Sequence, residues 1–141
     1  MNTGSVWLID SDIDDQEMVR QVWKELQLKN ELMFFDKGDE AMDYLGLIQT
    51  APFIIICELH LPKINGFELR ERMLATDSLK FKSVPFIFWT AHASEEYVTR
   101  AYDLSVHGFF IKKPSFEDVK VTFLNIINYW LRCEMPPKKE K

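Results

Sequence analysis

Residues 53–68 read Phe-Ile-Ile-Ile-Cys-Glu-Leu-His-Leu-Pro-Lys-Ile-Asn-Gly-Phe-Glu, an apolar run that ends at an acid and is followed by proline and glycine. A short apolar run bounded in this way is typical of a strand buried on both faces of a sheet. Similar runs occur at residues 6–9, 32–35, 86–89 and 109–111. Together with residues 53–57 they predict five strands.

The segments between these runs have helical periodicity. In residues 115–132 one face carries an apolar stripe, made by Phe116, Val119, Phe123, Ile126, Ile127 and Trp130. Ser115 is placed to cap this helix, and Asp118 lies in its first turn, where the helix dipole favours an acid. Strands that alternate with helices predict an α/β fold, a (βα)5 unit whose five-stranded parallel sheet has helices on both faces.

The 141 residues predict one domain, over residues 4–133, with a solvated tail at 134–141. No apolar run approaches the roughly 18 residues of a membrane helix, and the N-terminus lacks a signal-peptide core, so we expect a cytoplasmic protein without a membrane partner. A net charge of −5 argues against nucleic acid as a partner. Cys57 and Cys133 lack metal-ligand or disulfide spacing and are interpreted as packing residues.

Polar residues follow four of the predicted strands. These strand ends are Asp10-Ser11-Asp12, Glu58-Leu59-His60, Thr90-Ala91 and Lys112-Lys113-Pro114. Each alone is commonly a solvated loop, a helix cap or a β-forming residue. Because the carboxyl ends of parallel strands meet at one edge of a sheet, we expect acids, a hydroxyl and an ammonium to share one cleft.

At these motifs the sequence resembles the receiver domains of two-component response regulators, over nearly its whole length apart from the tail. The matching stretches are residues 7–12, 61–68, 85–90 and 108–114. The resemblance implies a flavodoxin-like receiver fold. It also makes Lys113–Pro114 a candidate for a cis peptide bond, which is common at that place in the family.

In the family, an aspartate after the third strand takes a phosphoryl group from phosphohistidine. Magnesium, held by that aspartate, an acidic pair and a backbone carbonyl, neutralises the phosphoryl oxygens. A threonine and a lysine then bind the phosphoryl group, and an aromatic residue on the fifth strand moves. The resemblance assigns these three roles to Thr90, Lys113 and Phe110.

This sequence departs from the family pattern where the chemistry occurs. Glu58 stands at the aspartate position, and Ser11 replaces the second acid of the pair that begins with Asp10. Glu58 places its carboxylate about 1.5 Å further out than aspartate would, and a misplacement of about 1 Å costs on the order of a hundredfold in rate. A magnesium site made by Asp10, Asp12, Glu58 and the backbone carbonyl of His60 is expected to be weak.

The sequence therefore predicts a stand-alone, non-enzymatic, pseudo-receiver-like domain that signals by contact. Glu58 either mimics the phosphorylated state by binding Thr90 and Lys113, or is a solvated acid on an inactive scaffold. A sensor histidine kinase, a phosphotransferase or another signalling protein is the expected partner, and a homodimer stays open. The expected partner face contains Tyr97, Val98, Ala101, Tyr102 and Phe110.

Two alternatives remain at this point. The first is a working phosphoacceptor that uses Glu58 or Asp12. The second is a phosphatase of the haloacid-dehalogenase type, in which Asp10 is the nucleophile of an Asp-x-Asp motif. Against the second, the sequence lacks paired acids after a later strand to complete its metal site, and it leaves the match at residues 58–68 unexplained.

Overall fold

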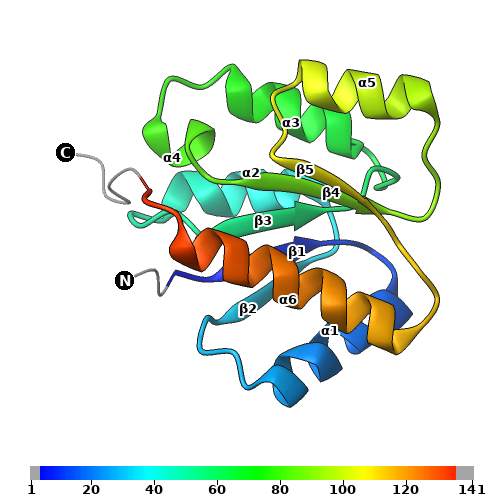
Figure 1. Ribbon diagram of the computed structural model, residues 1–141. Helices are drawn as coiled ribbons and strands as arrows, with labels where there is room; N and C mark the ends of the chain where they lie inside the picture. The colour runs from blue at the N-terminus through cyan, green and yellow to red at the C-terminus, as the bar shows by residue number, and fades with distance from the viewer. Residues whose placement is uncertain (1–3, 136–141) are drawn as a thin grey trace.

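The computed structural model describes residues 4–135, without the side chains of residues 79 and 80. One parallel sheet runs through the molecule in the order β2-β1-β3-β4-β5 (Figure 1). Its strands are β1 (Val6–Ile9), β2 (Leu32–Phe35), β3 (Ile54–Cys57), β4 (Phe86–Thr90) and β5 (Gly108–Ile111). The five predicted strands are therefore confirmed, each within one residue of its expected bounds.

Helices follow the strands in turn. They are α1 (Ile13–Leu26), α2 (Gly38–Leu47), α3 (Gly66–Leu74), the short α4 (Leu79–Lys82), α5 (Glu95–Asp103) and α6 (Phe116–Arg132). The predicted cap of α6 is confirmed, because the Ser115 side chain accepts a hydrogen bond from the backbone N–H of Asp118.

Helices cover both faces of the sheet, as the sequence predicts. Figure 1 shows α1 and α6 together on one face, with α2, α3 and α5 on the other. Val19, Phe123 and Trp89 belong to the buried cluster on the α1–α6 side, whereas Phe67 and Phe88 belong to the second cluster. Within residues 4–135, no helix has both the length and the apolar character needed to cross a membrane.

The strand register brings the predicted polar ends together. The backbone N–H of Glu58 donates to Ile9 O at 2.9 Å, and that of Lys112 donates to Thr90 O at 2.8 Å. Since β1 lies between β2 and β3 in the sheet, the ends of β1, β3, β4 and β5 form one continuous edge. The strand order reverses between β1 and β3, and this topological switch point is where open α/β sheets place their sites.

The expectations for the Lys113–Pro114 peptide bond and for the C-terminal tail have different outcomes. The peptide bond before Pro114 is trans, since residues 4–135 contain no cis peptide, so the expectation of a cis bond is wrong. Most of the tail, residues 136–141, lies outside the described residues. The domain bounds 4–133 stay a prediction.

Gly66 fixes the distance between α3 and the end of β3. A Cβ at this position would lie 2.7 Å from Glu58 O and 2.7 Å from the ring of Phe88, closer than real side chains approach. The backbone N–H of Gly66 also donates to Leu59 O at 2.9 Å. The first turn of α3 therefore packs directly on the backbone that carries Glu58.

We expect Gly66→Ala to lower the free energy of unfolding by about 1–3 kcal/mol, because the added methyl group overpacks a backbone contact. Gly46→Ala is the matched control, since a Cβ there meets nothing within 4 Å. Alanine in that helix should raise stability by roughly 0.5–1 kcal/mol. Urea denaturation of both variants measures the difference, and equal effects would contradict the packing argument.

Candidate functional site

Glu58 directly follows β3, and its carboxylate contacts residues from β4 and from the segment after β5. Its Oε2 accepts hydrogen bonds from Thr90 Oγ1 at 2.5 Å and from the backbone N–H of His60 at 3.1 Å. Its Oε1 accepts from Lys112 Nζ at 2.8 Å. Both carboxylate oxygens are thus engaged, in a site where Thr90 is fully buried and Glu58 nearly so.

Lys112, directly after β5, is the cation at the centre of the site. Its Nζ lies 2.8 Å from Asp10 Oδ2, 2.7 Å from Asp15 Oδ2 and 2.8 Å from Glu58 Oε1. An ammonium has three N–H donors, so each is used by one carboxylate. The Nζ atom also lies 4.9 Å from the centre of the Trp89 ring, which adds a cation–π contact.

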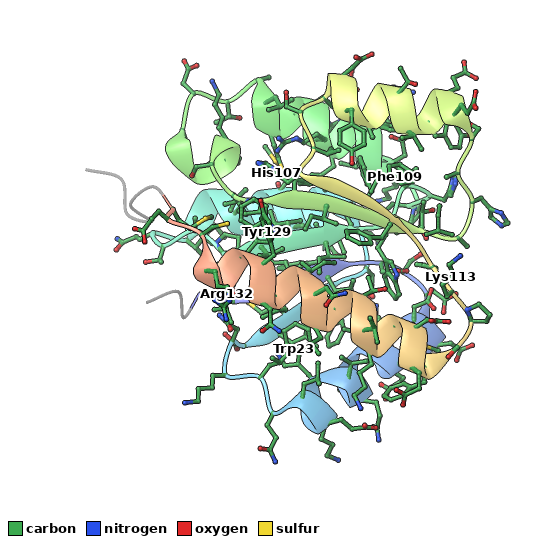
Figure 2. The ribbon with its side chains drawn as sticks, in the orientation of Figure 1. Trp23, His107, Phe109, Lys113, Tyr129 and Arg132 are labelled. Carbon is green, nitrogen blue, oxygen red and sulfur yellow. The ribbon has the colours of Figure 1, made fainter. Side chains whose placement is uncertain are left out.

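The structure corrects the lysine assignment. The resemblance pointed to Lys113, but Lys112 binds Glu58, while Lys113 is exposed and lines the cavity rim. Figure 2 shows Lys113 on the loop at the outer edge of the molecule. Consecutive side chains of an extended segment point opposite ways, so only one of the two lysines can enter. The pairing of Ile111 with Thr90 in the sheet identifies Lys112 as the lysine that enters the site. The position directly before Pro114, used in the sequence comparison, identifies Lys113 instead.

The acids after β1 also differ from expectation. Asp12 is exposed and caps α1, its carboxylate accepting from the backbone N–H of Asp15 at 3.1 Å. It therefore does not take the place of the missing second acid beside Asp10. Asp15, which the sequence reasoning did not single out, supplies the third carboxylate on Lys112. The sequence signal that could have identified Asp15 is its position three residues after the N-cap of α1. A side chain in this first helical turn points back toward the end of β1.

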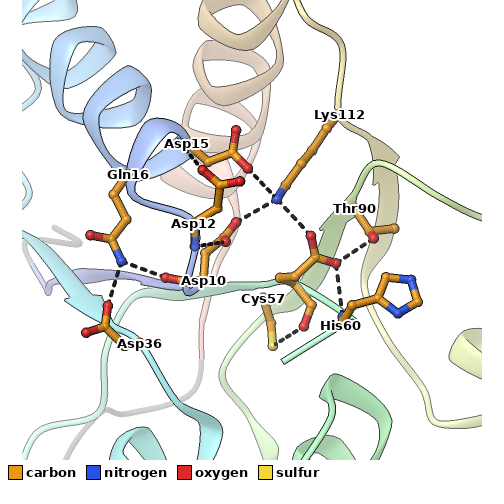
Figure 3. Close-up of polar contacts among 10 residues, drawn as sticks. Asp10, Asp12, Asp15, Gln16, Asp36, Cys57, His60, Thr90 and Lys112 are labelled. Carbon is orange, nitrogen blue, oxygen red and sulfur yellow. Dashed lines mark hydrogen bonds and ion pairs between the residues drawn. The ribbon is translucent and has the colours of Figure 1, made fainter. Parts of the chain in front are cut away.

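Gln16 is a second residue that the sequence reasoning missed. Its Nε2 donates to Asp10 O at 2.6 Å and to Asp36 Oδ1 at 2.8 Å (Figure 3). The Asp10 carboxylate is held from the other side, because its Oδ1 accepts from the backbone N–H of Asp12 at 2.9 Å. Gln16 therefore ties the end of β1 to α1 and to the residue that follows β2.

Burial and charge pairing act against each other in this site. The pKa of Asp10 is raised from 3.8 to about 6. Burial raises it, and this effect exceeds the lowering by Lys112 and by the backbone N–H of Asp12. Burial would also raise the pKa of Glu58, but hydrogen bonds from Lys112, Thr90 and His60 outweigh it and leave that pKa lowered. Burial lowers the pKa of Lys112, but the three carboxylates that it contacts raise it by more, so that the pKa lies above its ordinary value. The lysine and Glu58 are therefore a charged pair.

An open cavity of about 530 Å³ lies above these groups. It is lined by Asp10, Ser11, Asp12, Asp15, Glu58, His60, Ala91, Lys112, Lys113 and Pro114. All residues predicted for the acidic pocket and acceptor position thus meet here, together with Asp15 and Lys112.

The proposed magnesium ligands do not fit a metal in this arrangement. Asp12 caps a helix, and His60 presents its backbone N–H to Glu58. The point to which the Asp10, Asp15 and Glu58 carboxylates converge is taken by Lys112 Nζ. Among residues 4–135, no group of three or more His, Cys, Asp or Glu side chains is arranged to hold a metal ion.

The predicted switch and partner-face residues divide between surface and interior. Phe110 is half-buried and packs on the α1–α6 side, whereas its neighbour Phe109 packs on the other side, 6.0 Å from the Phe88 ring. Tyr97 and Tyr102 are exposed, but Ala101 is fully buried. Ala101 is therefore a core residue, contrary to its place in the expected partner face.

Residues 6–123 match the sequence profile described as Response regulator receiver domain. The chain belongs to this family. Such domains are regulatory parts of two-component phosphorelay signalling and interact with histidine kinases or phosphotransfer proteins. This assignment removes the basis for the haloacid-dehalogenase alternative, with Asp10 as nucleophile.

Curated relatives are distant. The chain is 26% identical over 136 residues to the probable methanogenesis regulatory protein FilR2 of Methanothrix harundinacea, covering 94% of this chain and 86% of that protein. It is 25% identical over 115 residues to the sensory transduction protein LytT of Oceanobacillus iheyensis, covering 80% of this chain but 45% of LytT.

Solved structures show the same fold. The phosphorylated cyanobacterial phytochrome response regulator RcpA superposes with a TM-score of 0.85 at 21% identity, covering 94% of this chain and 98% of RcpA. The Mn²⁺-bound form of response regulator Rcp1 gives a TM-score of 0.82 at 24% identity, covering 94% of this chain and 99% of Rcp1. The likeness to both supports the (βα)5 receiver fold.

Replacing the half-buried Lys112 should be far more costly than replacing the exposed Lys113. Lys112→Met leaves three largely buried carboxylates without their cation, and we expect a loss of about 3–5 kcal/mol in the free energy of unfolding. Lys113→Met changes an exposed side chain and should alter stability by no more than about 0.5 kcal/mol. Urea denaturation distinguishes the two, and equal losses would contradict the assignment of Lys112.

The raised pKa of Asp10 predicts a pH dependence of stability. A folded-state pKa of about 6 against 3.8 in the unfolded chain means that the folded state holds this proton more tightly. The stabilisation is present below the unfolded value and is lost as pH rises through about 6. Wild type should therefore lose this stabilisation between pH 4 and pH 7, whereas Asp10→Asn should not. The free energy of unfolding of Asp10→Asn should rise, relative to that of wild type, by on the order of 2 kcal/mol over this range.

The measurement is urea denaturation of wild type and Asp10→Asn at several pH values between pH 4 and pH 7. The pH dependence of the difference between their free energies of unfolding isolates the carboxyl group. A difference that stays constant over this range would refute the raised pKa.

Proposed function

We propose that this receiver domain signals by protein contact without efficient phosphorylation, because Glu58 stands where the family carries its phosphoacceptor aspartate. The observation that carries the proposal is the engagement of both Glu58 oxygens. Thr90 and Lys112, which hold them, match in type the threonine and lysine that bind the phosphoryl group in the resemblance. The groups that would receive a phosphoryl group are already bound to a carboxylate.

Phosphoryl transfer to Glu58 would require one of its oxygens to leave these partners. Separating one member of a buried ion pair costs about 3–5 kcal/mol. Because each 1.36 kcal/mol in a barrier is a tenfold change in rate, even a cost of about 3 kcal/mol slows transfer on the order of a hundredfold. The extra methylene of Glu58 slows transfer further, because it displaces the carboxylate from the position that an aspartate would give it.

The same contacts support a partial mimic of the phosphorylated state. Glu58 draws Thr90 and Lys112 to one carboxylate, as a phosphoryl group would draw them to its oxygens. The likeness is incomplete, because a carboxylate carries one charge and two oxygens, against about −1.5 to −2 and three for a phosphoryl group. A partner that recognises this geometry would bind constitutively.

The surface for such a partner is proposed to include Tyr97 and Tyr102 on α5. Both rings are exposed, at 36% and 53%. Tyr97 also lies 5.9 Å from the ring of His60, which borders the site cavity. The α5 surface and the site are therefore in contact through one aromatic pair, and a histidine kinase or phosphotransfer protein is the partner class that the family suggests.

Incubation with acetyl phosphate and Mg²⁺, followed by intact-mass measurement, tests the proposal. Wild type should stay unmodified, because the Glu58 oxygens are held by Lys112 and Thr90. The double variant Ser11→Asp with Glu58→Asp restores the acidic pair and shortens the acceptor, and should gain one phosphoryl group per molecule.

Glu58→Gln serves as the control that removes the carboxylate. Stoichiometric, base-labile phosphate on Glu58 or on Asp12 of the wild type would overturn the proposal in favour of a working phosphoacceptor. Peptide mapping distinguishes these two sites.

A further inference from the structure

The turn between α5 and β5 is held by side chains that lie outside the site at Glu58. Arg70 of α3 is buried, and its Nε donates to Leu104 O at 3.0 Å while its Nη2 donates to Ser105 O at 2.9 Å. Ser105 has a φ of 58°, a left-handed conformation that residues other than glycine keep only where the surrounding structure holds them. Arg70 therefore fixes the path by which the chain leaves α5.

His107, labelled in Figure 2, directly precedes β5 and makes a second contact at this turn. Its Nδ1 accepts a hydrogen bond from the backbone N–H of Phe86 at 3.0 Å, and its own backbone N–H donates to Phe86 O at 2.8 Å. An imidazole nitrogen accepts a hydrogen bond only while it carries no proton. Because Phe86 is fully buried, losing this acceptor would leave a buried N–H without a partner, which is costly. The contact therefore requires a neutral His107.

The surroundings of His107 do not compensate a positive charge. From β4 the imidazole meets the Phe86 backbone, and from α6 it meets Trp130, whose ring lies 5.6 Å away, and the neighbouring Tyr129. Burial and the positive charge of Arg70 lower the pKa of His107. Neither Arg70 nor His107 forms an ion pair with an acid within residues 4–135, and Arg70 Nη1 is buried without a hydrogen-bond partner.

We propose that His107 is a proton-sensitive latch, which holds the α5–β5 turn against β4 while its imidazole is neutral and releases the turn when the imidazole is protonated. Protonation removes the acceptor of the Phe86 N–H and adds a second cation beside Arg70. The helix α5 is exposed to this change, because Ala101 is the residue that it buries. The inference concerns a different part of the molecule from Glu58 and does not depend on the proposed function.

The direction of the pH response follows from the lowered pKa of His107. A group that holds its proton less tightly in the folded state stabilises that state above the unfolded value, here 6.5, and the stabilisation is lost as the pH falls below it. The latch is therefore closed at neutral pH and opens in acid. Release of the turn also frees the end of α5, on which the exposed Tyr102 lies.

Amide hydrogen exchange of the wild-type chain, followed by NMR at about pH 7 and at about pH 5, tests the latch. Protection factors correct for the intrinsic pH dependence of exchange. We expect those of Phe86 and residues 104–108 to fall roughly tenfold or more in acid, because an unpaired buried donor costs about 1–3 kcal/mol. Amides in the core of α6, such as that of Phe123, should keep their protection.

Two matched variants assign the response to His107. His107→Gln keeps a side-chain oxygen that can accept from the Phe86 N–H and cannot be protonated in this range, so its turn should stay protected at about pH 5. His92→Gln changes an exposed histidine in the loop after β4 and should respond to acid as wild type does. In wild type, the chemical shift of the Phe86 amide should change with the same midpoint as the His107 ring, below 6.5.

The inference is overturned if wild-type protection at residues 104–108 is the same at both pH values, or if His107→Gln loses it in acid as wild type does. It is also overturned if the Phe86 amide does not follow the titration of the His107 ring. This last readout needs no variant, so it decides the question even where His107→Gln is unstable. The acetyl phosphate experiment reports on Glu58 alone, so the two proposals can fail separately.

Discussion

The hydrogen bonds of the Lys112 ammonium to Asp10, Asp15 and Glu58 are the constraint on which the site depends. Without a cation, the carboxylates gathered at the carboxyl ends of the strands would repel one another. Lys112 joins β5 to β1, β3 and α1, and Thr90 adds β4 through Glu58. Four strand ends are therefore held together by one set of charge-assisted contacts.

The sequence predicts the fold well because the three central strands, β1, β3 and β4, are buried on both faces. A strand of this kind appears as a continuous apolar run, as at Ile54–Cys57, and cannot be confused with an amphipathic surface strand. The α6 cap was equally predictable, since Ser115 and Asp118 interact within one turn. Local patterns of this kind are complete within a few residues of sequence.

The site was less predictable because it is set by contacts between distant segments. The choice between Lys112 and Lys113 depends on the register of β5 against β4, which places Ile111 opposite Thr90. The choice between Asp12 and Asp15 depends on where α1 begins, because the residue at the cap gives its carboxylate to the helix. For the lysine, the sequence predicted the residue type but not the direction of the side chain, whereas Asp15 was not among the predicted site residues.

The central claim is that a lysine ammonium occupies the point where the three carboxylates converge. A crystal structure of the wild-type protein soaked in Mn²⁺, with an anomalous difference map, tests it directly. The account predicts Lys112 Nζ within hydrogen-bonding distance of Asp10, Asp15 and Glu58, without an anomalous peak among them. A manganese peak bound to Asp10 and Glu58, with the Lys112 side chain displaced, would contradict it.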